Sequence, residues 1–173
     1  NAIAQGYSVD LVSGFLESKG IQNYLVEIGG EVRTQGVNNK GKSWRIGIDK
    51  PLDNNNVPGE NLQAIISLSG KSLATSGNYR KFYERDGVKY SHTIDPKTGY
   101  PVTHSLLSAT VIANDCMTAD AYATAFMVMG LEQAYKLAQE LPDIEAYFIY
   151  NDENGEYQEK MTPAMEAFIE KIQ

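Results

Sequence analysis

Apolar residues recur with a helical period at the start of the chain and with a strand period through its middle. Over residues 3–16 an apolar residue stands at every fourth position, namely Ile3, Tyr7, Leu11 and Phe15. This spacing predicts an amphipathic helix, and Gly20 follows it at the position where helices commonly end in a left-handed residue.

Extended segments predominate between residues 23 and 113. NYLVEIGGEVRTQG predicts two short strands about Gly29-Gly30, and SWRIGIDKP predicts a strand that Pro51 helps to end. After the polar loop LDNNNVPGEN, the segment LQAIISLSGKSLATSGNY predicts one or two strands. YRKFYERDGVKYSHTI then predicts a hairpin that turns at Asp86-Gly87, and LLSATVIAND predicts a buried strand.

The segment DPKTGYP predicts a tight turn ahead of that buried strand. Asp95 stands at its first position, Pro96 fixes φ at the second, and Gly99 is suited to a left-handed conformation.

The last third of the chain returns to a helical period. Helices are predicted at about 118–129 and 132–141, followed by a strand in EAYFIYND, a turn at ENG and a final helix in TPAMEAFIEKIQ. Thr162 is the expected N-cap of that final helix, with Pro163 at its first position. This order of elements predicts one α+β domain over residues 1–173, with a largely antiparallel sheet packed with helices.

Composition and charge exclude several classes of partner. The formal net charge of −7 argues against nucleic acid or an anionic membrane, and no stretch reaches the roughly 18 apolar residues of a membrane span. Cys116 is the only cysteine, which excludes an internal disulfide and leaves the compartment open. The chain begins without methionine and enters a helical pattern at once, so we expect it to lack an N-terminal portion.

Asp120 and Thr124 stand four residues apart in TADAYATAFMVMG, so a helix places the carboxylate and the hydroxyl on one face. The spacing alone favours a structural interpretation, in which Asp120 caps the helix and Thr124 bonds back to the carbonyl of Asp120. The alternative is a Mg²⁺ site, because Mg²⁺ takes only one or two carboxylates and completes its shell with phosphate and water oxygens.

His92 lies in VKYSHTI, three residues before the predicted turn. Strand alternation groups it with Val88, Tyr90 and Ile94, which is typical of a core residue. Because turns at strand ends often carry reactive groups, His92 is equally a candidate general base. His104 is assigned to a loop.

Two glycine-containing segments, IGGE and ATSGNY, supply backbone N–H groups and small residues that can approach a phosphate or a flat ring. Neither a GxGxxG fingerprint nor a P-loop occurs, and Ser76 does not lie in a GxSxG elbow. The common dinucleotide, NTPase and hydrolase signatures are therefore missing.

Five motifs in series resemble those of the ApbE-type FAD:protein FMN transferases. They are AIAQGYSVD, EIGGEVRTQG leading into WRIGIDKP, ATSGNYR, HTIDPKTGYP and ADAYATAFMVMG, and they cover nearly the whole chain. The resemblance implies a T-fold-like α+β protein. It further implies an enzyme that binds FAD with Mg²⁺ and transfers FMN to a threonine or serine hydroxyl of another protein, releasing AMP.

The resemblance also assigns roles to residues. It implies that Asp120, Thr124 and the backbone carbonyl of Ala2 hold Mg²⁺. It implies that His92 receives the proton of the acceptor hydroxyl, with Asp95 as an orienting group. The expected flavin contacts are Gln5, Gly29, Gly30, Ser76, Gly77, His92 and Thr93.

The chain departs from the family pattern at two places. Gln5 stands where the family often has lysine, so a neutral hydrogen bond is expected to replace a cationic contact, with lower affinity for FAD. The family's N-terminal segment, which supplies part of the FAD pocket, lies outside this chain, so we expect the fragment by itself to be impaired or inactive.

Acceptors of the family carry a segment resembling S/T-G-A-S/T, and this chain has none. The acceptor is therefore expected to be a separate protein, typically a membrane-associated electron-transfer subunit. The resemblance implies a location in the cell envelope, on the periplasmic side, with a lipid anchor on the N-terminal portion. Three alternatives stay open: an FAD pyrophosphatase giving FMN and AMP, a protein that holds FAD without turnover, and an interaction domain in which Asp120 is only a cap.

Overall fold

The computed structural model describes residues 2–51, 57, 59–78, 82–85, 88–91 and 93–170. The helices are α1 (Ala4–Ser18), α2 (Cys116–Met129), α3 (Leu131–Glu140) and the short 3₁₀ helix η1 (Pro163–Phe168). The strands are β1 (Tyr24–Ile28), β2 (Glu31–Gln35), β3 (Trp44–Asp49), β4 (Leu62–Leu68), β5 (Ser72–Gly77), β6 (Phe82–Arg85), β7 (Val88–Ser91), β8 (Leu106–Ala113), β9 (Glu145–Asn151), β10 (Tyr157–Met161) and β11 (Ile169–Glu170).

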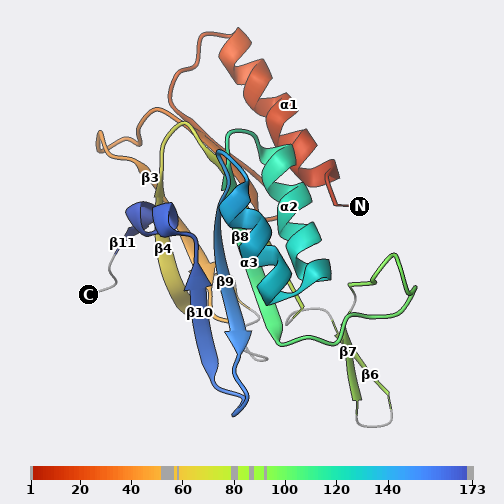
Figure 1. The fold of residues 1–173 in the computed structure, drawn as a ribbon. Helices are drawn as coiled ribbons and strands as arrows, with labels where there is room; N and C mark the ends of the chain where they lie inside the picture. The colour runs from red at the N-terminus through yellow and green to blue at the C-terminus, as the bar shows by residue number, and fades with distance from the viewer. Residues whose placement is uncertain are drawn as a thin grey trace.

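A six-stranded antiparallel sheet forms the centre of the fold, in the order β1-β2-β5-β8-β9-β10. Helices α1, α2 and α3 lie on one side of it, and the smaller sheet β11-β4-β3 lies on the other (Figure 1). The predicted α+β class with a largely antiparallel sheet is confirmed.

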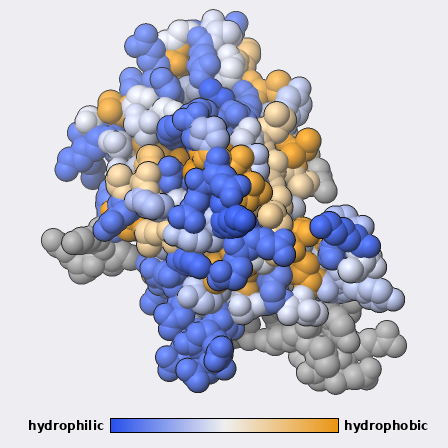
Figure 2. Space-filling view, in the orientation of Figure 1, coloured by the Kyte–Doolittle hydropathy of each residue, from blue (hydrophilic) through white to orange (hydrophobic). Residues whose placement is uncertain are grey.

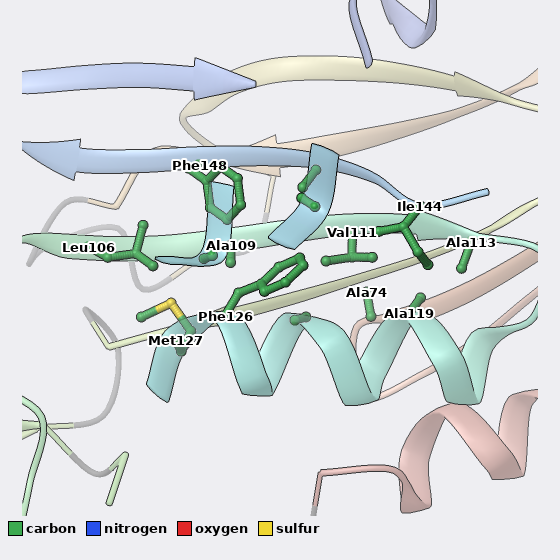
Figure 3. Packing of buried hydrophobic residues seen from close by; sticks show 14 residues of the cluster. Ala74, Leu106, Ala109, Val111, Ala113, Ala119, Phe126, Met127, Ile144 and Phe148 are labelled. Atoms are coloured by element: carbon green, nitrogen blue, oxygen red, sulfur yellow. The ribbon is translucent and has the colours of Figure 1, made fainter. Parts of the chain in front are cut away.

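Helix α2 supplies the core between the helices and the central sheet. Phe126 and Met127 point from α2 toward β8 and β9 (Figure 3), and the rings of Phe126 and Phe148 lie 5.6 Å apart. A second cluster joins the other side of the sheet to β3 and β4, through Ile66, Leu68 and Ile149 among others. Strand β8 is therefore covered on both faces, which is why its sequence is almost continuously apolar.

Most of the predicted elements are confirmed near their predicted bounds. Helix α1 ends before Gly20, which adopts a φ of +78°. Gly29 and Gly30, both at positive φ, form the turn between β1 and β2. LQAIISLSGKSLATSGNY yields two strands, β4 and β5, and these belong to different sheets.

The prediction for the C-terminus is wrong. The segment from Pro163 forms a single stretch of 3₁₀ helix, and the chain then extends so that β11 pairs with β4. Glu170 accepts a hydrogen bond from Arg45 Nε at 2.7 Å, which favours the extended conformation. Thr162 occupies the N-cap position, but its hydroxyl donates to Glu145 and accepts from the Ala146 N–H instead of capping η1.

Strand β10 was not predicted. Its central residues are Gln158, Glu159 and Lys160, so the apolar signal of a buried strand is missing. It lies at the edge of the six-stranded sheet, where charged side chains discourage pairing with another chain.

The predicted hairpin is confirmed by the antiparallel pairing of β6 with β7. Its expected turn residues, Asp86 and Gly87, lie outside the described residues, as does His92. Among the helices that the structure describes, none has the length and apolar character needed to cross a membrane.

Candidate functional site

The first turns of helices α1 and α2 lie side by side (Figure 1). A carboxylate from each helix caps the first turn of the other. Asp10 of α1 accepts hydrogen bonds from the backbone N–H groups of Cys116 and Met117 at 3.0 and 2.8 Å. Asp120 of α2 accepts one from the Gly6 N–H at 3.0 Å. Both carboxylates therefore satisfy N–H groups that the first turn of a helix leaves without partners, and each is stabilised by the positive end of the opposite helix dipole.

Gly6 permits this close contact. A Cβ at Gly6 would lie 2.4 Å from the backbone oxygen of Cys116 and 2.8 Å from the Cβ of Asp120. No side chain fits at those distances, so the residue at this position must be glycine for the two helices to keep their spacing. Arg33 of β2 donates to Asp10 at 2.8 Å and ties the helix pair to the sheet.

Asp120 does not cap its own helix. That role belongs to Asp115, whose carboxylate accepts hydrogen bonds from the Thr118 N–H and hydroxyl at 2.8 and 2.9 Å. Asp120 lies one turn further on, with 5% of its surface exposed. The interpretation of Asp120 as the cap of its own helix is therefore wrong, although its carboxylate does serve the first turn of α1.

Thr124 lies one turn after Asp120 and reaches the neighbouring strand. Its Oγ1 is 3.3 Å from Oγ of Ser76, near the end of β5. Three oxygen-bearing side chains from α2 and β5 thus lie on one wall: Asp120, Thr124 and Ser76.

These groups line a cavity of about 810 Å³. Eight of the residues predicted from the sequence line it: Gln5, Gly29, Gly30, Ser76, Gly77, Thr93, Asp120 and Thr124. They come from α1, the β1–β2 turn, β5, the segment after β7, and α2, so the fold brings together motifs that are far apart in the chain. Apolar side chains supply much of the remaining wall, including Ile46, Leu73 and Met127.

Two predicted site residues, Ala2 and Asp95, are not among the described residues that line this cavity. The Asp95 carboxylate accepts from the Lys97 N–H at 2.9 Å and from the Thr98 hydroxyl at 3.2 Å, so it organises its own turn. The predicted turn is confirmed by the hydrogen bond from the Gly99 N–H to the Asp95 carbonyl. Because His92 is outside the described residues, its pairing with Asp95 stays a prediction.

Sequence reasoning missed Glu31 at the start of β2. Its side chain is 8% exposed and lines the cavity, and its Oε2 has no hydrogen-bond partner among the described residues. Burial, and then the negative charges of Asp120 and Glu27, raise the pKa of Glu31 to about 7. Its position in the IGGE segment was the available signal, but only the fold shows that the carboxylate is buried beside Asp120.

The donor set suits a Mg²⁺ ion shared with phosphates. Asp120, Thr124 and Ser76 offer hard oxygens on one wall, and the negative charge of Asp120 adds to the burial that raises the pKa of the neighbouring Glu31. Within the described ranges there is no cluster of three or more His, Cys, Asp or Glu that forms a complete protein cage. A site with so few protein ligands fits Mg²⁺, which keeps phosphate and water oxygens in its shell.

The model of the ApbE family matches residues 1–148. The chain belongs to the ApbE family. It is 43% identical to a protein named FAD:protein FMN transferase from Vibrio cholerae, over 99% of this chain and 49% of that protein. A protein of the same name from Escherichia coli is 37% identical over 98% of this chain and 46% of its own length.

Solved ApbE structures share the fold. The flavin transferase ApbE from Vibrio cholerae has a TM-score of 0.82 and 42% identity, covering 96% of this chain and 51% of that chain. The ApbE protein from Thermotoga maritima has a TM-score of 0.81 at 31% identity, covering 98% of this chain and 52% of that one. The chain thus spans about half the length of the ApbE relatives that it matches.

Proposed function

We propose that this chain provides the metal side of the active site of a FAD:protein FMN transferase. The reaction is the Mg²⁺-dependent transfer of FMN from FAD to a threonine or serine hydroxyl of an acceptor protein, with release of AMP. The names of the ApbE relatives support flavin transfer. The observation that carries the proposal for this chain is the wall formed by Asp120, Thr124 and Ser76 in a cavity of about 810 Å³.

The cavity has the size and chemistry of a nucleotide site. Its volume lies within the range of roughly 300–1,000 Å³ that is usual for small-molecule pockets. Apolar side chains from β3, β5 and α2 suit a flat ring, and Gly29, Gly30 and Gly77 leave room for a ligand to approach the backbone. The proposed oxygen ligands for a phosphate-bound cation line the same cavity.

The proposed step exchanges the phosphoanhydride bond of FAD for a phosphoester bond to the acceptor. The acceptor hydroxyl oxygen attacks the phosphorus of the FMN half of FAD, and the bond to the bridging oxygen breaks. The electron pair leaves with AMP, and the hydroxyl proton passes to a base, for which His92 is the candidate. Phosphoryl transfer of this kind depends mainly on positioning the reactants and on stabilising negative charge.

The residues of this chain prepare that environment. The Gly6 N–H holds one oxygen of Asp120, which orients the carboxylate and leaves Oδ1 for a cation. Thr124 is held against Ser76, so both hydroxyls come from rigid elements packed on the central sheet. Bound Mg²⁺ would neutralise charge on the pyrophosphate oxygens. We propose the Ala2 carbonyl as a further ligand, because α1 begins two residues after it and its Gly6 N–H donates to Asp120.

Mass spectrometry of an acceptor protein tests the proposal. We would incubate the chain with FAD, Mg²⁺ and a protein carrying one S/T-G-A-S/T segment, and measure the intact mass of that protein. The assay is run with the chain alone and with the other half of an ApbE relative added, and a gain of FMN less one water, with AMP released in equal amount, is expected at least when both halves are present. EDTA or Asp120→Asn should abolish the gain, whereas Glu153→Gln removes an exposed carboxylate from the turn after β9 and should preserve it.

Each other outcome points to a different function. Free FMN and AMP with an unmodified acceptor would support a pyrophosphatase instead. Binding of FAD without AMP release would indicate a protein that holds the dinucleotide without turnover. Activity restored only by adding the other half of an ApbE relative would show that the transferase site needs both halves.

A further inference from the structure

The Glu31 carboxylate lines the cavity, and neither the contacts of the described residues nor the proposed metal site account for its chemistry. It enters the cavity from the start of β2, directly after the Gly29-Gly30 turn. Its side chain is more than nine-tenths buried, yet Oε2 has no hydrogen-bond partner among the described residues. Because an unpartnered buried carboxylate oxygen is costly, its persistence here points to a donor supplied by a ligand.

Gln5 of α1 lies beside this carboxylate. A Cβ on Gly29 would lie 1.8 Å from Gln5 Nε2 and 3.3 Å from Glu31 Oε2. The absence of a side chain at Gly29 therefore lets an amide donor and a carboxylate acceptor approach the same point of the cavity wall. All three residues line the cavity.

The mixed character of this pair limits what it can bind. A phosphate would be repelled by the nearby charge of Asp120, and by Glu31 whenever its carboxyl group is ionised. A cation would be disfavoured by the Gln5 N–H groups. A hydroxyl group donates one hydrogen bond and accepts others, so it satisfies the carboxylate and the amide together.

We propose that Glu31 and Gln5 form a subsite for the hydroxyl-bearing chain next to the phosphates of the bound dinucleotide, with Glu31 as its positioning residue. This inference rests on the proposed function, since it takes the ligand to be FAD. FAD carries such hydroxyls on both sides of its pyrophosphate, on the ribityl chain of the FMN half and on the ribose of the AMP half. Both have the chemistry that the subsite requires.

Calorimetric titration of the chain with FMN, AMP and their 2′-deoxy analogues, in buffer with Mg²⁺, tests the subsite. Glu31→Gln should weaken binding of one probe by about tenfold or more, because a hydrogen bond to a carboxylate is lost. The same variant should leave the deoxy analogue of that probe nearly unaffected. FMN as the sensitive probe would identify the ribityl chain, and AMP would identify the ribose.

Two comparisons separate this role from general effects of charge. Glu140→Gln removes the same charge from an exposed position at the end of α3, away from the residues that line the cavity, so it reports the loss of net charge alone. Equal weakening by Glu140→Gln and Glu31→Gln would overturn the subsite. Glu31→Gln that lowers Mg²⁺ affinity without nucleotide, and keeps the preference for the hydroxylated probe, would instead make Glu31 a metal ligand and also overturn it.

The titrations also distinguish the subsite from the proposed function. Binding that depends on Glu31 and on the hydroxyl, together with an acceptor that gains no mass, would retain the subsite and reject the transferase. Failure of the unmodified chain to bind either probe would overturn both the subsite and the flavin pocket.

Discussion

Helix α1 buries its face of small side chains and exposes its face of large apolar side chains, which is the reverse of a usual amphipathic helix. The packed face carries small or short side chains, and Gly6, Val9 and Ser13 are buried. The opposite face carries the large apolar residues Ile3, Tyr7, Leu11 and Phe15, which are 49–60% exposed. Figure 2 shows apolar surface interrupting the hydrophilic face along the part of the molecule where α1 lies.

The difference reflects what each face must do. The packed face approaches α2 closely enough for each helix to cap the other, which places Asp120 at the cavity. Large side chains would prevent that approach. Apolar periodicity therefore identified the helix, while the requirements of the site determined which face is buried.

Adding one methyl group to the packed face should give the largest effect. Gly6→Ala places a Cβ 2.4 Å from the Cys116 carbonyl oxygen, which belongs to the backbone and cannot rotate away. We expect a loss of about 3 kcal/mol in the free energy of unfolding, measured by urea denaturation. Mg²⁺-dependent flavin binding should fall as well, because the Gly6 N–H no longer holds Asp120.

Gly14 provides the matched control on the same helix. It is exposed, and a Cβ added there would meet nothing within 4 Å, so Gly14→Ala should stabilise the chain by about 0.5–1 kcal/mol. Similar effects of the two substitutions would refute close helix contact as the reason for glycine at position 6.

Removing the cap on α2 should give the next largest effect. Asp10→Ala leaves the Cys116 and Met117 N–H groups and the Arg33 guanidinium without their carboxylate, at an expected cost of about 2 kcal/mol. Asp10→Asn keeps an acceptor oxygen and should recover part of that loss. Urea denaturation curves that coincide for Asp10→Ala and the unmodified chain would rule out reciprocal capping as a source of stability.

The buried carboxyl group of Glu31 should make the stability of the chain depend on pH. With a pKa of about 7, Glu31 keeps its proton in the folded chain over a range where the unfolded chain has already released it, above about 4.5. The free energy of unfolding should therefore fall as pH rises through this window, by about 2 kcal/mol from this group. Glu31→Gln should remove that component.

Denaturation at pH 5 and pH 8 in the presence of EDTA measures this component, because the chelator excludes stabilisation by bound metal. Only the difference between the unmodified chain and Glu31→Gln is assigned to Glu31, since other groups titrate in the same range. An identical change in both proteins would show that Glu31 ionises normally in the folded state.

Local patterns in the sequence predict part of this fold. The bounds of α1, α2, α3 and β8 follow from local periodicity, and the turns at Gly29-Gly30 and Gly99 follow from local chemistry. Strand β10 lacked an apolar pattern because it lies at an edge. The extended segment β11 depends on pairing with β4, about 100 residues earlier in the chain, which no local pattern reveals.

The site, like the fold, could be predicted only in part from the sequence. The residues of the five motifs could be named from the resemblance, and eight of them line one cavity. The reciprocal caps and the unpartnered Glu31 oxygen could not be predicted, because they depend on distances between α1, α2 and β2. Spacing within α2 suggested a cap for Asp120, whereas the fold assigns that role to Asp115 and directs Asp120 toward α1.

The smallest expected effects compare single truncations on the two faces of α1. Val9 is fully buried, so Val9→Ala should lower the free energy of unfolding by about 1.5 kcal/mol through lost burial and an imperfectly filled space. Leu11→Ala removes more atoms but from a side chain that is 57% exposed, and it should change stability by less than about 0.5 kcal/mol. Urea denaturation of both variants in the same buffer gives the ratio of their losses in the free energy of unfolding. A larger loss for Leu11→Ala would mean that the exposed face is packed in solution, and the contrast between the two faces would then be one of size and not of burial.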